Sequence, residues 1–458
     1  MHSIQIKKTV AKRLQQDFSG QPFSTADLRQ LFLPVLIDRT FLIMFGFINT
    51  ALISASGSAT IAAVNMVESL NVFLVSMISA VALAGTVLVA RNFGAGRGSK
   101  VSEVMTTSVF ITFVIGVMFC IISLAFKTSF LQVIFGSAQA DVMRIAQTYF
   151  LGVLLTYPSL AILEGINGVL RGINRTKSTL IISLVTNFLY LGLSLILVIG
   201  LKQGILGLMI AMNLSRILGA IFALKLLLKN MKEDGFRLSR MAQISRHQMV
   251  SVIKTSLPFA SEQLFFNGVK IIMQMIVVQL GTAAIAAHAI VSTLAPMSEI
   301  IPVALSIVII PIVGQSLGQQ NPQGAKKITR VFLIYGSLLV YAMDFLVMIP
   351  ALPLLMRLFH VASDVQPIVR QAYWVVVMFH GLAFACFAIL PAALKAARDA
   401  VYSTTVSLVT MWGIRVILGY LLAKTCHLGV VGIWLAMAAE WLVKDVILVA
   451  RFNRKEWE

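Results

Sequence analysis

Charged side chains are scarce in this chain of 458 residues: they make up 12% of it, while 58% of the residues are apolar. A soluble domain is about half apolar and about a quarter charged, so the composition excludes an ordinary soluble enzyme. Acidic residues are the rarer charge, with 18 Asp and Glu against 37 Lys and Arg. Together with a mean hydropathy of +0.90, this composition predicts an all-α polytopic membrane protein.

Cysteine is also rare, and Cys120, Cys386 and Cys426 lie in or beside apolar runs without CxxC or His-rich spacing. This excludes a disulfide framework and a zinc site. The chain has no HExxH motif and no nucleophile elbow, and the glycine-rich run 94–100 lacks the Gly-Lys-Ser/Thr of a phosphate loop. We therefore expect no enzymatic activity and no cofactor apart from a transported ion.

Apolar runs long enough to span a bilayer, about 20 residues each, recur twelve times. Lys and Arg gather in alternate connections, such as that holding Arg171 and Arg175, and the opposite connections are poor in them. By the positive-inside rule both termini are cytoplasmic, which requires an even number of spans. The excess of positive charge therefore indicates topology and no nucleic-acid partner.

The two halves of the chain resemble each other at a constant offset. Pro34 matches Pro258, and 183–186 matches 407–410. Each copy holds six spans, so the copies are predicted to be parallel repeats related by a pseudo-twofold axis along the membrane normal, enclosing a cavity. The predicted parts are a cytoplasmic N-terminal tail, an N-lobe, a cytoplasmic linker, a C-lobe and a cytoplasmic C-terminal tail, at residues 1–27, 28–228, 229–249, 250–450 and 451–458.

Several ordered motifs carry a family resemblance. They are Asn49-Thr50-Ala51, Ile61–Asn65 and Ala90–Gly96 in the first half, and Gly281–Ala287 and Val313–Gly318 in the second. The set resembles the multidrug and toxic compound extrusion (MATE) family over nearly the whole chain. This resemblance implies an exporter of bulky organic compounds that is coupled to Na⁺ or H⁺ and works by alternating access. With no ATPase motif present, uphill transport must draw on an ion gradient.

The sequence departs from the family pattern at Asn49, where many members carry an aspartate. An asparagine can ligate an ion through its carbonyl oxygen but cannot carry a proton. The tenth span (366–394) also lacks the acid that one branch of the family uses, and its titratable residue is His380. The run Ala396–Ala400 with Met411–Gly413 resembles a bacterial branch that includes flavin exporters.

Ionisable residues inside a span are costly and are functional candidates by default. In the eighth span (284–315), Glu299 lies near the midplane, and it shares one face of the helix with His288, Ser292 and Ser306. The alternative role for such an acid is structural, as the partner of a neighbouring base. The candidates for cation coupling are Glu299, Glu68, Asp38, Glu262 and Asn49.

The seventh span (250–280) carries a polar face around Lys270, which lies too deep to reach the interface easily and needs a partner or an anion. Arg216 and Arg415 are equally deep, and Glu440 is the expected partner of one of them. Aromatic residues of the tenth span either stack on a planar substrate or pack in the core. The substrate or gate candidates are Lys270, Asn267, Gln274, Gln263, His288, Ser292, Tyr373 and His380.

The sequence thus predicts a monomeric secondary efflux antiporter of the bacterial inner membrane. Its expected partners are the lipid bilayer and a small organic substrate, either a cationic drug or a flavin-like anion. Two alternatives stay open: a lipid-linked oligosaccharide flippase of the wider superfamily, and a non-transporting membrane receptor or scaffold.

Overall fold

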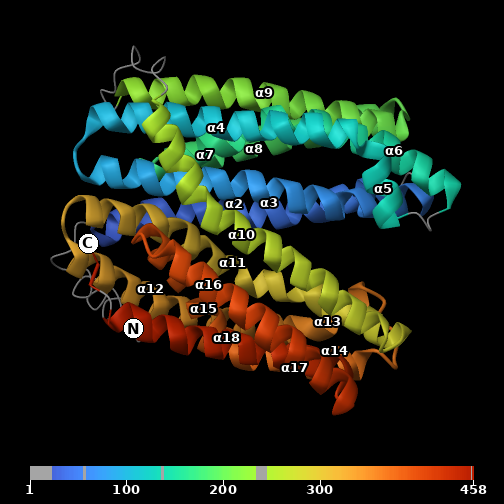
Figure 1. The fold of residues 1–458 in the computed structure, drawn as a ribbon. Coiled ribbons are helices and arrows are strands. Elements are labelled where there is room, and N and C mark those ends of the chain that lie inside the picture. The colour runs from blue at the N-terminus through green and yellow to red at the C-terminus, as the bar shows by residue number, and fades with distance from the viewer. Residues whose placement is uncertain (1–22, 55–57, 136–138, 234–244, 455, 458) are drawn as a thin grey trace, which may run out of the picture. The chain divides into compact units, whose positions relative to one another are not determined.

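A computed structural model describes residues 23–54, 58–135, 139–233, 245–454 and 456–457. These residues form helices and turns, and no strand occurs among them (Figure 1). The predicted all-α fold is therefore confirmed for the described residues. Most of the predicted N-terminal tail and of the central linker lies outside the described residues.

The helices of the two halves follow one another in the same order. The first half contains α2 (Thr25–Ser54), α3 (Ser58–Gly94), α4 (Gly98–Ala125), α5 (Lys127–Phe135), α6 (Ala140–Leu155), α7 (Tyr157–Gly172), α8 (Thr176–Ser194) and α9 (Gly204–Glu233). The second contains α10 (Arg246–Val278), α11 (Thr282–Gly318), α12 (Pro322–Met343), α13 (Ile349–Leu358), α14 (Gln366–Phe379), α15 (Ala385–Ala396), α16 (Ala400–Thr410), α17 (Ile417–Tyr420) and α18 (Gly429–Arg454).

Eight helices of the described chain are long and apolar enough to cross a membrane, and α6 with α7, bent by 44°, adds a ninth. Three further helices, α2, α10 and α18, have 30, 33 and 26 residues and carry ionisable side chains along their length. Counted with α12–α13, α14–α15 and α16–α17 as single rods, the described residues give six long rods in each half. This agrees with the twelve predicted spans.

The chain packs as two compact units, one formed by Leu33–Gln263 and the other by Leu264–Glu458 together with residues up to Phe32. In the first unit, α7 packs on α3 and α4, and α9 packs on α6, α7 and α8. In the second, α15 packs on α11 and α12, and α18 packs on α14, α15 and α16. Equivalent helices thus have equivalent neighbours, which supports the internal repeat.

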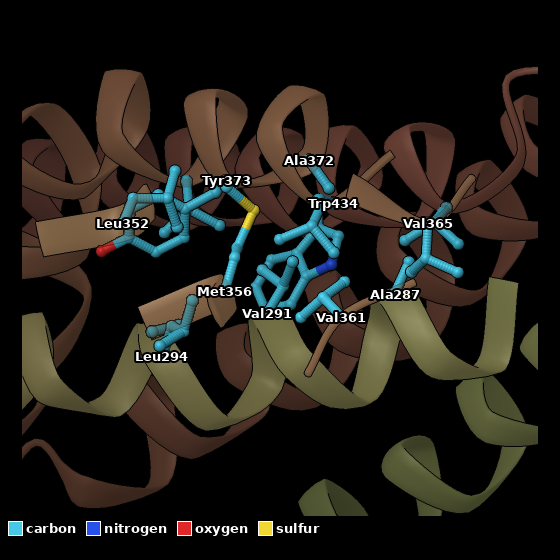
Figure 2. Packing of buried hydrophobic residues seen from close by; sticks show 14 of the residues in the cluster. Ala287, Val291, Leu294, Leu352, Met356, Val361, Val365, Ala372, Tyr373 and Trp434 are labelled. Atoms are coloured by element: carbon cyan, nitrogen blue, oxygen red, sulfur yellow. The ribbon is translucent and has the colours of Figure 1, made fainter. Parts of the chain in front are cut away.

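An apolar cluster forms part of the core of the second unit (Figure 2). Val291 and Leu294 of α11, Met356 of α13, Tyr373 of α14 and Trp434 of α18 are all buried within it. Burial of such side chains stabilises each by about 1.5–3 kcal/mol. The cluster therefore holds α11, α13, α14 and α18 together beside the ionisable groups described below.

Close helix packing in the first unit depends on Gly168 of α7. A methyl group added there would lie 2.5 Å from the backbone carbonyl oxygen of Ala82 in α3. We expect Gly168→Ala to lower the free energy of unfolding by about 1–3 kcal/mol through overpacking, measured by thermal unfolding in detergent. Gly192→Ala is the matched control, because no atom lies within 4 Å of its added methyl group. Equal effects of the two changes would contradict this account of the packing.

Candidate functional site

A histidine between two carboxylates is the central polar feature of the second unit. His380 Nδ1 lies 3.3 Å from Asp344 Oδ2, and His380 Nε2 lies 3.6 Å from Glu299 Oε1. Glu299 comes from α11, and Asp344 follows directly after α12. We call these three residues the triad.

The triad is closed at one end and open at the other. The side chains of Asp344 and His380 are fully buried, whereas that of Glu299 is 23% exposed. Trp441 stacks on the His380 ring, with centroids 5.7 Å apart, and the Phe384 ring lies at 5.2 Å. Glu299 is therefore the exposed member of the triad.

Four ionisable residues of this unit lie in π-helical turns, and one of them, Lys424, is partly exposed in the turn Leu421–Thr425; the other three are buried. Asp344 begins the turn Asp344–Met348, His380 begins the turn His380–Phe384, and Arg415 lies in the turn Met411–Val416. Such turns are rare and often mark functional sites in helices. Here they interrupt three transmembrane rods at the positions of polar groups.

Arg415 and Glu440 form a buried ion pair. Arg415 Nε donates to Glu440 Oε2 at 2.9 Å, and Nη2 donates to the same oxygen. Both side chains are almost completely buried. The pairing of a deep arginine with Glu440, predicted from the sequence, is confirmed.

Lys270 lies between this pair and the triad. Its Nζ is 4.6 Å from the centroid of the Phe266 ring, and the Arg415 guanidinium is 5.8 Å from the same ring. Lys270 interacts electrostatically with Glu299 and Arg415. Together with Gln274 it lines an open groove of about 580 Å³ along α10. Lys270 is thus a solvent-accessible cation within reach of the triad.

The first unit holds a second polar cluster, centred on Glu68 of α3. Tyr149 donates a hydrogen bond to Glu68 Oε1 at 2.9 Å, and Asn71 Nδ2 donates to Oε2 at 2.9 Å. Tyr157 in turn donates to Asn71 Oδ1 at 3.4 Å. Glu68 is therefore an acid held by neutral donors.

Asn49 and Arg216 belong to neighbouring contacts of the same unit. Tyr190 donates to Asn49 Oδ1 at 2.5 Å, and Arg216 Nη1 donates to Thr156 Oγ1. Arg216 also interacts electrostatically with Tyr190. The carbonyl oxygen of Asn49, predicted as an ion ligand, is thus engaged by a phenol in this structure.

The two clusters occupy corresponding positions of the repeat. The offset that carries Pro34 onto Pro258 also carries Tyr149 onto Tyr373 and Thr156 onto His380. With one inserted residue, the same offset carries Arg216 onto Trp441. The contact of Arg216 with Thr156 in one unit therefore corresponds to the stacking of Trp441 on His380 in the other. Equivalent positions of the two halves thus carry different side chains that make different contacts.

This correspondence gives a paired prediction. Tyr149→Phe removes a hydrogen bond to a carboxylate and should lower the free energy of unfolding by about 1.5–3 kcal/mol. Tyr373→Phe removes a neutral bond to Ser298 and should lower it by about 0.5–1.5 kcal/mol. Thermal unfolding of the two variants in detergent measures both effects. A larger loss for Tyr373→Phe would contradict the assigned partners.

The remaining candidates are dispersed. Asp38 interacts electrostatically with Arg171, and Ser292 lies 3.4 Å from His288, whose ring lies 5.7 Å from that of Trp434. The polar residues Glu262, Gln263 and Asn267 of α10 each have an interaction partner. Tyr373 is buried in the apolar cluster of Figure 2, as its packing alternative predicts.

Asp344 was not among the candidates named from the sequence. A lone acid deep in the ninth predicted span (327–350) carries the same signal that identified Glu299, namely an ionisable group within an apolar run. Lys444 and Asp445 were also missed. Both are buried in α18, and Asp445 interacts electrostatically with Lys444 and Glu440.

Comparison with known protein families matches this chain in two parts, which correspond to the two copies of the internal repeat. A sequence model of the MatE family matches residues 34–196 and 258–421, which is more than half of the chain. The second match begins at Pro258, the repeat equivalent of the Pro34 at which the first begins, and it is longer by a single residue. The family model thus recognises the two halves separately, in the register found within the sequence.

Two curated relatives are probable multidrug resistance proteins NorM. That of Thermotoga maritima is 21% identical over 437 residues, covering 94% of this chain and 93% of the relative. That of Oceanobacillus iheyensis is 22% identical over 434 residues, covering 92% and 94%. The similarity thus extends over nearly the full length of both proteins.

Solved structures show the same fold. A MOP superfamily transporter from Pyrococcus furiosus, described as having a binding pocket of reverse polarity, superposes with a TM-score of 0.84 at 16% identity over 96% of this chain and 97% of its own. A MATE protein in the straight conformation gives a TM-score of 0.85 at 17% identity over 96% and 98%.

Proposed function

Because this chain belongs to the MatE family, we propose that it is a secondary active antiporter, exporting bulky organic compounds in exchange for Na⁺ or H⁺ by alternating access. It is a multi-pass membrane protein, and we place it in the bacterial plasma membrane with both termini cytoplasmic and lobes at 28–228 and 250–450. Its relatives, named as multidrug resistance proteins, support a small organic substrate.

The observation that carries this proposal is the triad among transmembrane helices. Two buried ionisable side chains and one partly exposed acid meet there, and a bilayer tolerates such groups mainly where an ion or substrate uses them. Antiport requires the cation and the substrate to favour different states of the protein. A carboxylate that changes charge on binding the cation, beside the groove at Lys270, supplies that difference.

The side chains in and near the groove have opposite charges, so two classes of substrate remain possible. Glu299 favours a cationic drug, whereas Lys270 favours a flavin-like anion. Lys270 has no carboxylate partner within ion-pair distance among the described residues. Both classes therefore enter the test.

The test is efflux from proteoliposomes containing the full-length protein, with ethidium as the cation and flavin mononucleotide as the anion. Na⁺ and pH gradients are imposed separately. Transport driven by either gradient is the expected result. Failure with both gradients, together with flipping of a fluorescent lipid-linked oligosaccharide, would replace the antiporter with the flippase alternative, and failure in all assays would favour the receptor or scaffold.

A further inference from the structure

We propose that the coupling ion is one proton, shared by His380 with the carboxylates of Asp344 and Glu299. The inference rests on the antiport function and specifies its ion. It identifies His380 as the proton carrier, at a point where the repeat has Thr156 in the other unit.

The geometry of the triad calls for an added proton. A neutral imidazole has one N–H group and one nitrogen lone pair. Here a carboxylate oxygen faces each ring nitrogen, at 3.3 Å and 3.6 Å. With neutral His380 and two ionised acids, a lone pair therefore faces a carboxylate. One extra proton, on the ring or on either acid, gives both contacts a hydrogen.

The net charge of the surrounding groups also calls for one added proton. Electrostatic contacts link the triad through Lys270 and Arg415 to Glu440, Asp445 and Lys444. Four acids and three bases leave one negative charge when His380 is neutral, and one added proton cancels it. A neutral set is favoured inside a bilayer, where net charge is expensive. The acids are Glu299, Asp344, Glu440 and Asp445, and the bases are Lys270, Arg415 and Lys444.

The side chains around His380 suit a proton better than a sodium ion. A hard cation is bound by several converging oxygens, but here an imidazole stands between the two carboxylates. No group of three or more His, Cys, Asp and Glu side chains in the described residues is arranged to hold a metal ion. Asp344 Oδ1 is buried without a hydrogen-bond partner among those residues, so this acid has capacity for a proton.

The path follows the exposure of the groups. A proton from water binds Glu299 and then transfers from its oxygen to His380 Nε2, so that the imidazolium donates from Nε2 to Glu299 and from Nδ1 to Asp344 Oδ2. The contact of 3.6 Å must shorten to about 3 Å for this transfer. The ionisable groups on the elements packed against His380 include Glu299 on α11, Tyr341 and Asp344 on the α12 side, Tyr373 on α14, Cys386 on α15, and Glu440, Lys444 and Asp445 on α18.

The first test is transport by the full-length protein in proteoliposomes, with ethidium and flavin mononucleotide as probes. A pH gradient should drive transport in sodium-free buffer, and a Na⁺ gradient at equal pH should not. For ethidium, exchanged one to one with H⁺, a gradient of one pH unit should support about a tenfold substrate gradient. H380Q should lose this drive while keeping substrate counterflow, and E299D should retain part of it.

The outcomes separate the two proposals. Drive by Na⁺ alone, or full pH-driven transport by H380Q, would overturn the proton assignment and leave the antiporter intact. A substrate gradient of about a hundredfold at one pH unit would overturn the single proton. Loss of counterflow in the wild type would reject the antiporter itself.

A second measurement needs no transport. Trp441 stacks on His380, and a protonated imidazole quenches an adjacent indole. In a variant that keeps Trp441 and replaces the other four tryptophans by phenylalanine, emission should fall as pH falls, and adding H380Q should remove the transition. Subtracting the W441F titration from that of the wild type gives the same information if that variant does not fold. A titration unchanged by H380Q would overturn the assignment.

Discussion

Arg415→Met is expected to lower the free energy of unfolding by about 3–5 kcal/mol, because it leaves Glu440 ionised and buried without its partner. Glu440 is fully buried, and its Oε2 accepts both hydrogen bonds from Arg415. Thermal unfolding in detergent, followed by tryptophan emission, measures the loss.

A double variant distinguishes the missing partner from lost packing. Arg415→Met combined with Glu440→Gln removes both charges and should recover most of the stability, since replacing a buried pair by neutral groups is often nearly neutral. The exposed pair of Lys229 with Glu233, 3.9 Å apart, is the control. Lys229→Met should cost at most about 1 kcal/mol. If the double variant is no more stable than Arg415→Met, the unpaired charge is not the cause.

Glu299→Gln should abolish substrate accumulation driven by an ion gradient while leaving expression and folding normal. The amide keeps the shape of the side chain but cannot change its charge, so cation binding no longer distinguishes the two states of the transporter. Because the Glu299 side chain is 23% exposed, the substitution introduces no fully buried amide. Efflux of ethidium from proteoliposomes, with quantification of the reconstituted protein, measures the result.

Asp364→Asn is the matched control, because Asp364 is an exposed acid between α13 and α14. We expect its efflux rate to equal that of the wild type. Accumulation by Glu299→Gln at the rate of this control would remove Glu299 from the coupling mechanism.

The architecture was predictable because it depends on quantities that a sequence displays directly. Apolar length defines the spans, and the matches of Pro34 with Pro258 and of 183–186 with 407–410 define the repeat. A pairing of Glu440 with either Arg216 or Arg415 was also predictable, since opposite charges deep in apolar spans have few alternatives, but the structure was needed to choose Arg415.

The arrangement of the triad was not predictable in the same way. A helical wheel assumes about 100° per residue, and this does not hold across the π-helical turn that begins at His380. A regular helix would place Tyr373, His380 and Phe384 on one face, and all three are buried. Whether a rod forms a π turn depends on its packing partners as well as on its own sequence, so the meeting of His380 with Asp344 required the structure.

The π-helical turns at Asp344, His380 and Arg415 have a mechanical consequence. Each holds more residues per turn than an α-helix does, so these rods contain extra residues at the turns where their polar groups lie. Conversion of a π-helical turn into regular α-helix would rotate the following segment by up to about 100° for each extra residue that is absorbed. Neighbours of the three side chains can then be exchanged by a local twist, with the rest of each rod unchanged.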